Sequence, residues 1–226
     1  MVSFHFGLPD PDLLERVRRS GALILGNATT LAEAQWLIGK VDMIIAQGFE
    51  AGGHAGYFLN GHRPVGTIAL TRQIALEVAF AAIPVIAAGG IVDAAGITAA
   101  LMLGAGAVQL GTAYLFTPEA TISDAHRASL RDETTITNLF SGGLARGVRN
   151  ALIDAMGPVH PDAPRFPYAS AALAELRRKA ERDGRGDYSP LWAGQAADHG
   201  PMSGEGAQML TGRLARETFE LLGETP

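Results

Sequence analysis

The sequence contains no cysteine among its 226 residues. This absence excludes disulfides, thiolate metal sites and a cysteine nucleophile, and it is compatible with a reducing cytoplasm. No apolar run approaches the roughly 20 residues that a membrane-spanning helix needs. The first residues also lack the basic region and long apolar core of a signal peptide. We therefore expect a soluble, cytoplasmic protein with no membrane partner.

Positive charge is scarce as well, because the formal net charge at pH 7 is -5. Nucleic-acid backbones bind clustered Lys and Arg, so nucleic acid is not expected as a partner. Histidine and acidic residues do not recur at the spacing of metal ligands, which predicts no metal site. With 47% hydrophobic residues the chain can bury a substantial core, and its length suits one α/β domain.

Short apolar runs alternate with helical patterns over the first half of the chain. Strands followed by helices at regular spacing predict a parallel sheet with right-handed crossovers. The strands are expected at residues 2–6, 22–25, 41–46, 84–88 and 107–110. The helices are expected at residues 11–20, 31–38, 68–81 and 94–103, and another is expected to start at Thr117-Pro118-Glu119.

The pattern weakens from Thr134 onward, so residues 134–226 are expected to form a C-terminal extension. Within it we expect extended chain at 134–140 and irregular chain at 150–167. A helix is predicted at 169–182, coil at 184–204 and a final helix at 205–222.

The most informative stretch runs from Ala46 to Gly56 and follows the apolar run 41–45. In an α/β barrel, the loop after the carboxyl end of a strand carries the chemistry. Glycines in this stretch let backbone approach a ligand, and His54 can change charge near neutral pH. His54 is therefore the candidate catalytic residue. Glu50 is expected to be a solvated loop carboxylate or a helix-cap partner, and His5 remains an outside candidate.

Two further strand ends carry glycines, at Gly89-Gly90 and at Gly111. Because these strands are consecutive, their ends are expected to form a cup of backbone N–H groups that suits a phosphate dianion. In eight-stranded barrels the phosphate site is formed by loops after the last two strands. Turn glycines without a ligand are the alternative for these positions.

These stretches resemble the nitronate monooxygenase family, also called 2-nitropropane dioxygenase, whose members are FMN-dependent enzymes with a TIM-barrel fold. The resemblance lies in segments 46–54, 84–91, 108–112, 137–142, 145–147 and 191–195. It implies an FMN phosphate held around Gly89, Gly90, Gln109, Leu110, Gly111 and Thr112. It further implies flavin contacts from Gln47, Gly52 and Gly53, and it matches His54 to the family's active-site histidine.

The implied function is oxidation of an alkyl nitronate or nitroalkane with dioxygen to a carbonyl compound and nitrite. His54 would hydrogen-bond the anionic nitro group or act as a general base. Two alternatives stay open on the same scaffold. One is NAD(P)H-dependent reduction of a quinone or an enoyl thioester, and the other is an inactive truncated member that serves in binding or dimerisation. Homo-oligomerisation is left open, and Trp192 and Gln195 either close over the flavin or pack a C-terminal segment.

The sequence departs from the family pattern in two places. Family members usually begin with about three more strands, so we expect a single FMN-binding domain over 1–226 built as an incomplete (β/α)8 barrel of about five β/α units. The family more often has Arg-Pro where this chain has Gly143-Leu144.

Overall fold

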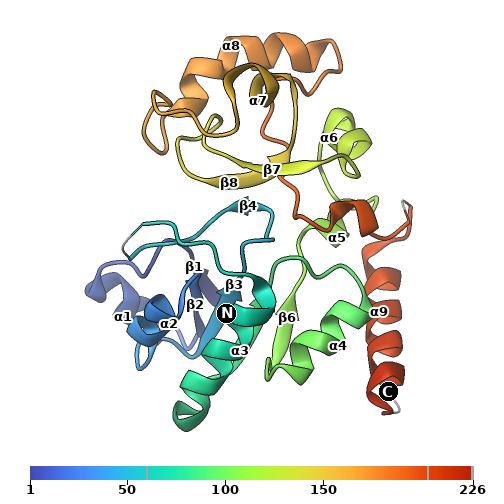
Figure 1. The fold of residues 1–226 in the computed structure, drawn as a ribbon. Helices are drawn as coiled ribbons and strands as arrows, with labels where there is room; N and C mark the ends of the chain where they lie inside the picture. Colours follow the sequence, from blue (N-terminus) through green and yellow to red (C-terminus); the bar gives the residue numbers. More distant parts are fainter. Residues whose placement is uncertain (60, 203, 225–226) are drawn as a thin grey trace. The chain divides into compact units, whose positions relative to one another are not determined.

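The computed structural model describes residues 1–59, 61–202 and 204–224 (Figure 1). Its contacts divide the chain into two compact units. Unit 1 consists of residues 1–49, 56–91 and 95–109, and unit 2 consists of residues 50–55, 92–94 and the chain from Leu110 onward. The single domain expected over 1–226, with 134–226 packed on it, stays a prediction.

Unit 1 contains a five-stranded, fully parallel sheet. Its strand order is β1 (Val2–Phe4), β2 (Ile24–Ala28), β3 (Met43–Gln47), β5 (Val85–Ala88) and β6 (Ala107–Gln109). The parallel β/α alternation predicted from the sequence is therefore confirmed. Strand β2 lies later than predicted because Gly26, Asn27 and Ala28 continue to pair with β3.

Side chains of this sheet alternate between two faces, as the period of a strand requires. On one face, Ile24, Ile44 and Val85 pack with Leu37 and Leu70 from the neighbouring helices. On the opposite face, Leu25, Ile45, Ile86 and Ala88 form a second cluster. The helices of this unit are α1 (Pro11–Arg19), α2 (Leu31–Leu37), α3 (Thr67–Val78) with its 3-10 extension η1 (Ala79–Ala81), and α4 (Ala94–Met102).

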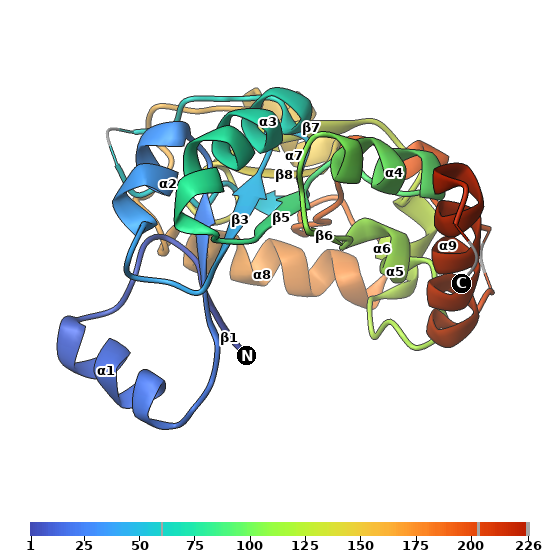
Figure 2. The same ribbon diagram turned by 90° about the horizontal axis from the view of Figure 1, so that it is seen from below.

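Helix α1 buries none of its residues completely, and its Leu14 and Val17 pack against the first cluster as partly buried side chains (Figure 2).

A buried carboxylate anchors the start of α2. Thr30 caps the helix by accepting a hydrogen bond from the Glu33 backbone N–H at 3.3 Å. The Glu33 side chain is fully buried and accepts four hydrogen bonds, two from Thr29 and one each from the backbone N–H groups of Phe58 and Leu59. Since a buried carboxylate is costly without partners, these bonds hold the 58–59 segment at the start of α2.

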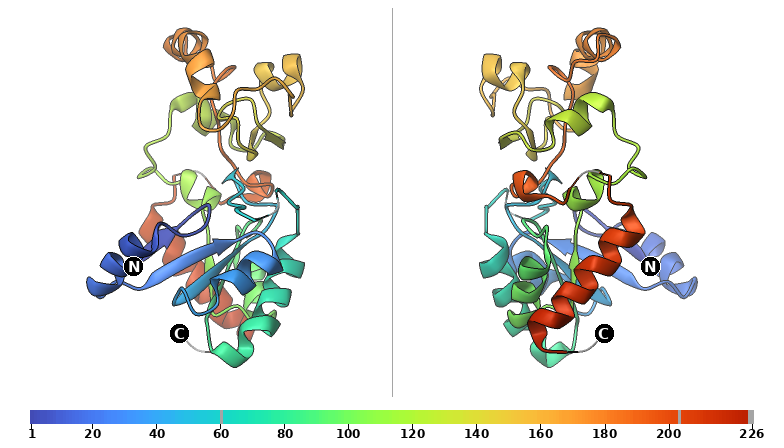
Figure 3. Two further views of the ribbon diagram at one scale, coloured as in Figure 1. Left: turned by 90° about the vertical axis from the view of Figure 1, so that its left-hand side faces the viewer. Right: turned by 90° about the vertical axis from the view of Figure 1, so that its right-hand side faces the viewer.

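Unit 2 is built on a small antiparallel sheet with the order β4 (Gly53–His54), β8 (Ala145–Val148) and β7 (Thr134–Thr137). Helices α7 and α8 lie on one side of this sheet (Figure 3). The helices of the unit are α5 (Thr112–Leu115), α6 (Asp124–Ser129), α7 (Ala151–Met156), α8 (Ala169–Arg182), η2 (Ala197–His199) and α9 (Ala207–Leu222).

Two local predictions were wrong. No helix starts at Thr117, because the Arg127 guanidinium binds the carbonyls of Leu115, Thr117 and Ala120 and holds that chain in turns. The next helix, α6, begins only at Asp124. Residues 150–167 are not wholly irregular, since the Asn150 side chain caps the short helix α7.

Replacement of Glu33 by Gln is expected to lower the free energy of unfolding by about 1–3 kcal/mol. An amide has one acceptor oxygen, so two of the four donors would face an N–H group instead. Urea denaturation followed by circular dichroism measures the loss. Glu77→Gln is the matched control, because Glu77 accepts a single hydrogen bond at an exposed site. Equal stability of the two variants would contradict the anchoring role of Glu33.

Candidate functional site

In unit 1, the carboxyl ends of β2 and β3 carry two amide side chains that bind each other. Asn27 Nδ2 donates to Gln47 Oε1 at 3.0 Å, and the Gly56 backbone N–H donates to the same oxygen at 2.9 Å. A Cβ atom on Gly56 would lie 2.4 Å from both Asn27 Nδ2 and His5 Cε1. The structure therefore brings His5, Asn27 and Gln47 together around Gly56, and Gln47 is the last residue of β3 rather than part of the loop.

In the same unit, the chain turns at two glycines after the end of β5. Thr67 lies between this turn and the residue that follows β3. Gly89 and Gly90 have φ angles of 109° and 70°, a region that glycine enters at little cost. Thr67, the first residue of α3, donates from Oγ1 to the Gly89 carbonyl at 2.9 Å. A Cβ on Gly48 would lie 1.9 Å from that same Oγ1. Gly48 is thus required for the close approach of α3.

The chain that follows β6 was predicted to help hold a phosphate. Gln109 ends β6 and Thr112 begins α5. Thr112 Oγ1 accepts a hydrogen bond from the Gly194 N–H at 2.8 Å. Gly111 has a φ of -107°, and apart from its two chain neighbours no atom of the described residues lies within 4 Å of the place its Cβ would occupy. Neither backbone conformation nor packing within the described chain requires glycine at 111.

In unit 2, one hydroxyl group holds His54. His54 lies in β4, where it pairs with Ala145 of β8. Its Nε2 is 2.7 Å from Ser141 Oγ. Ser141 Oγ also accepts the Gly143 N–H and can donate to the Gly143 carbonyl, both at 3.2 Å. Since a hydroxyl has one hydrogen, its rotation is coupled to the tautomer of His54.

Two aromatic rings contact the His54 imidazole. Phe166 and Trp192 stand edge-on to it, with ring centroids 5.4 and 5.3 Å away. Trp192 packs in turn edge-on against Phe140 at 5.9 Å, and its carbonyl lies 3.1 Å from His126 Nε2. Hydrogen bonding and ring contacts therefore fix both the position and the plane of His54.

The turn before His54 runs against a later segment of the same unit. A Cβ on Gly52 would lie 2.6 Å from the Ala193 carbonyl carbon and from the Gly194 nitrogen, so packing alone requires glycine there. Glu50 is half-buried, and its charge acts on Arg146, which is 4% exposed. Burial lowers the pKa of the Arg146 guanidinium and the negative charge of Glu50 opposes that shift. Glu50 thus lies within electrostatic reach of a buried cation and is half-buried, whereas a solvated carboxylate or a helix-cap partner was expected.

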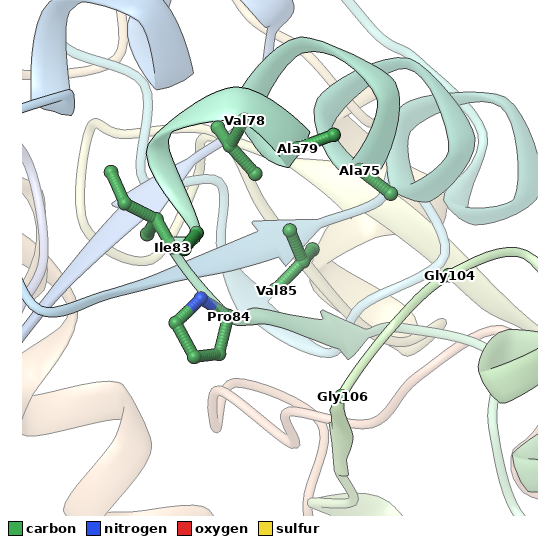
Figure 4. Close-up of a pocket in the computed structure, with 9 residues that line it drawn as sticks. Ala75, Val78, Ala79, Ile83, Pro84, Val85, Gly104 and Gly106 are labelled. Carbon is green, nitrogen blue, oxygen red and sulfur yellow. The ribbon is translucent and has the colours of Figure 1, made fainter.

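A separate apolar pocket of about 350 Å³ lies at the amino-terminal ends of the unit 1 strands (Figure 4). Ala75, Val78 and Ala79 line it from α3 and η1, and Pro84 and Gly106 line it at the starts of β5 and β6. It contains no titratable side chain. In parallel α/β proteins the chemistry occurs at the opposite, carboxyl ends of the strands, so this pocket is not the candidate site.

Comparison with known proteins identifies the family. Residues 1–209 match the family described as nitronate monooxygenase. The chain belongs to this family. Two curated relatives named nitronate monooxygenase, from Paraburkholderia phytofirmans and Pseudomonas aeruginosa, are 45% and 42% identical to it. Both matches cover 87% of this chain but only 55% and 57% of the relatives, so this nitronate monooxygenase family member spans about half of their length.

Solved structures agree with this assignment. A nitroalkane oxidase from Streptomyces ansochromogenes superposes with a TM-score of 0.88 and 37% identity, covering 98% of this chain and 65% of that one. FabK from Thermotoga maritima superposes with a TM-score of 0.75 and 25% identity, covering 98% and 68%. The resemblance to an enzyme family and the α/β, TIM-barrel-type fold predicted from the sequence are confirmed.

Sequence reasoning missed the residues that position the candidates. Thr67, Ser141 and Phe166 were not singled out, although Ser141 lies within a segment that resembles the family. Among the described residues no group of three or more His, Asp or Glu side chains could hold a metal ion. Over the same residues, every helix is too short or too polar to cross a membrane.

Replacement of Ser141 by Ala is expected to change the tautomer of His54, because it removes the only hydroxyl hydrogen bond to Nε2 that the described contacts give. We expect one tautomer to dominate in the wild type and a mixture in Ser141→Ala. Nitrogen-15 NMR of the histidine rings measures the two populations. Ser129→Ala is the control, since Ser129 Oγ donates to the His126 carbonyl. An unchanged tautomer ratio in Ser141→Ala would show that another contact sets it.

Proposed function

We propose that this member of the nitronate monooxygenase family is an FMN-dependent oxidoreductase that oxidises alkyl nitronates with dioxygen to carbonyl compounds and nitrite. The observation that carries the proposal is the fixed imidazole of His54, held by Ser141 between Phe166 and Trp192. A planar anion such as a nitronate needs a polar partner at its oxygens and apolar surface at its alkyl group. A histidine between aromatic rings supplies both.

His54 is the proposed catalytic residue. Its imidazole can donate a hydrogen bond to the nitro oxygens, or it can accept the α-proton of a neutral nitroalkane as a general base. Ser141 positions the ring, because rotation of the imidazole would break the 2.7 Å contact with Nε2. The two aromatic rings place apolar surface against the imidazole, and a hydrogen bond to an anion is stronger in less polar surroundings.

FMN is the proposed cofactor, and it supplies the electron-transfer chemistry when bound. We propose that backbone groups of Gly89, Gly90, Gln109, Leu110, Gly111 and Thr112 hold its phosphate, and that Gln47, Gly52 and Gly53 contact the flavin. The open space beside Gly111 fits this assignment, since a Cβ there would meet no atom of the described chain. The positive φ angles of Gly89 and Gly90 fit it as well, because they let backbone N–H groups turn toward a ligand.

Replacement of Gly111 by Ala is expected to weaken FMN binding about tenfold or more while leaving the thermal unfolding midpoint nearly unchanged. The added methyl group meets no described atom of the protein but would occupy space proposed for the phosphate. Flavin absorbance and fluorescence titration of the purified chain measure the dissociation constant. Gly106→Ala is the matched control, because its Cβ would make only ordinary contacts, at 3.8 Å or more. Equal affinities of the two variants would remove Gly111 from the FMN site.

Replacement of His54 by Asn is expected to leave flavin bound and to lower nitrite formation from a nitronate at least about a hundredfold. His199→Asn is the control, because the His199 side chain is 80% exposed. Full activity of His54→Asn would contradict the catalytic role. Anaerobic bleaching of the flavin by NADH or NADPH, without nitrite formation, would replace the proposal by NAD(P)H-dependent reduction of a quinone or enoyl thioester.

A further inference from the structure

The segment before α8 places an aromatic ring directly beside His54. Phe166 contacts the imidazole edge-on, with an interplanar angle of 69°. Its ring also lies over the backbone of Gly143, where a Cβ would stand 2.9 Å from Phe166 Cδ2 and 3.5 Å from His54 Cδ2. The ring of Phe166 therefore fills the space that a side chain at position 143 would take, beside His54 Cδ2.

Gly142, next to Gly143, also has to lack a side chain. Gly142 has a φ of +87°, and its Cβ would lie 2.1 Å from the Pro164 carbonyl oxygen. Residues 164–166 thus pass over a turn that has no side chains at 142 and 143. Real Cβ atoms do not approach backbone so closely, so a side chain at either position would displace Phe166 from His54. Glycine at 143, where the family more often has Arg, is what admits the ring.

The segment that carries Phe166 is tied to the rest of unit 2 at its start. Asn138 binds His160 in both directions, with Nδ2 donating to the His160 carbonyl at 2.9 Å and Oδ1 accepting its N–H at 3.0 Å. Around Phe166 itself the chain forms a turn, in which the Tyr168 N–H donates to the Arg165 carbonyl at 2.8 Å. These bonds order the backbone that carries Phe166, so its ring forms a wall beside His54.

The two rings beside His54 differ in how they are packed. Trp192 is partly buried and packs against Phe140 and the core cluster around it, and a Cβ on Gly147 would lie 2.9 Å from Trp192 Cε3. Phe166 is 46% exposed. One ring is part of the core of unit 2, whereas the other presents a face to whatever lies beside His54.

We propose that Phe166 is a specificity-determining residue whose ring limits the size of the alkyl group that can lie beside His54. The protein should therefore prefer anions with short alkyl groups over those with long ones. The identity of the anion as a nitronate rests on the proposed function. The shape of the site around His54 does not depend on the proposed function.

The first test compares ethyl nitronate with hexyl nitronate in FMN-loaded wild type, Phe166→Leu and Phe166→Ala. Removal of the ring opens apolar space, and each methylene that leaves water for such space gains up to about fourfold in binding. The ratio of kcat/KM for hexyl over ethyl nitronate should rise at least about tenfold in Phe166→Ala and less in Phe166→Leu. Tyr168→Ala is the control, since Tyr168 lies on the same segment with 71% exposure. An unchanged ratio in Phe166→Ala would overturn the inference.

The second test uses binding alone. Acetate and hexanoate are planar anions with two oxygens, as nitronates are, and His54 ring signals in NMR report their dissociation constants. Phe166→Ala should raise the hexanoate-to-acetate affinity ratio about tenfold, and Tyr168→Ala should not. If this ratio rises in a protein that does not turn over nitronates, the wall at Phe166 stands and the proposed reaction fails. If neither carboxylate binds, or the ratio is unchanged, the inference fails.

Discussion

The turn Ser141-Gly142-Gly143 is the constraint on which the geometry around His54 depends. Its first residue supplies the hydroxyl that binds Nε2. The next two supply nothing but space, which Pro164 and Phe166 then occupy. A side chain at either glycine would push the 164–166 segment away, and loss of the hydroxyl would release the imidazole. One short turn thus sets the hydrogen bond, the plane and one aromatic wall of the histidine.

In unit 1, the two faces of the sheet differ in polarity toward the carboxyl ends of the strands. The face of β2 and β3 toward α2 and α3 is apolar along its whole length. The opposite face is apolar at Leu25 and Ile45 but ends in Asn27 and Gln47. A buried amide lowers stability unless it is hydrogen-bonded, and here one oxygen of Gln47 accepts two hydrogen bonds. Polar side chains that lie only at the carboxyl ends of these two strands and are hydrogen-bonded there are typical of strands that present a site.

The sequence predicted the parallel sheet because strand periodicity, turn glycines and helix caps are local signals that agree with one another. It did not predict β4 or β8. Strand β4 has only two residues and therefore no period, and the four residues of β8 are all buried, so they show no alternation between an apolar and a polar face. The same holds for the site. His54 could be found from its glycine-rich surroundings, but Ser141 and Phe166 reach it through tertiary packing, and no local pattern around residues 141 or 166 points to residue 54. The predicted helix start at Thr117 was wrong because a distant side chain, Arg127, donates hydrogen bonds to the backbone carbonyls before α6.

The glycines near the candidate site look alike in the sequence, yet the structure separates their reasons. Gly52 is required by backbone of the same unit that lies against it, and Gly89 is required by its positive φ. Either would be glycine whether or not a ligand binds. Gly111 has an ordinary φ, and within the described part of the chain only its own neighbours lie close to where its Cβ would be. A residue that the fold does not need, at the end of a parallel strand, is the kind of position where a ligand accounts for the missing side chain. The most distinctive sequence segment, around Gly52 and His54, therefore supports the family assignment, whereas the less distinctive Gly111 carries the stronger physical argument for a bound cofactor.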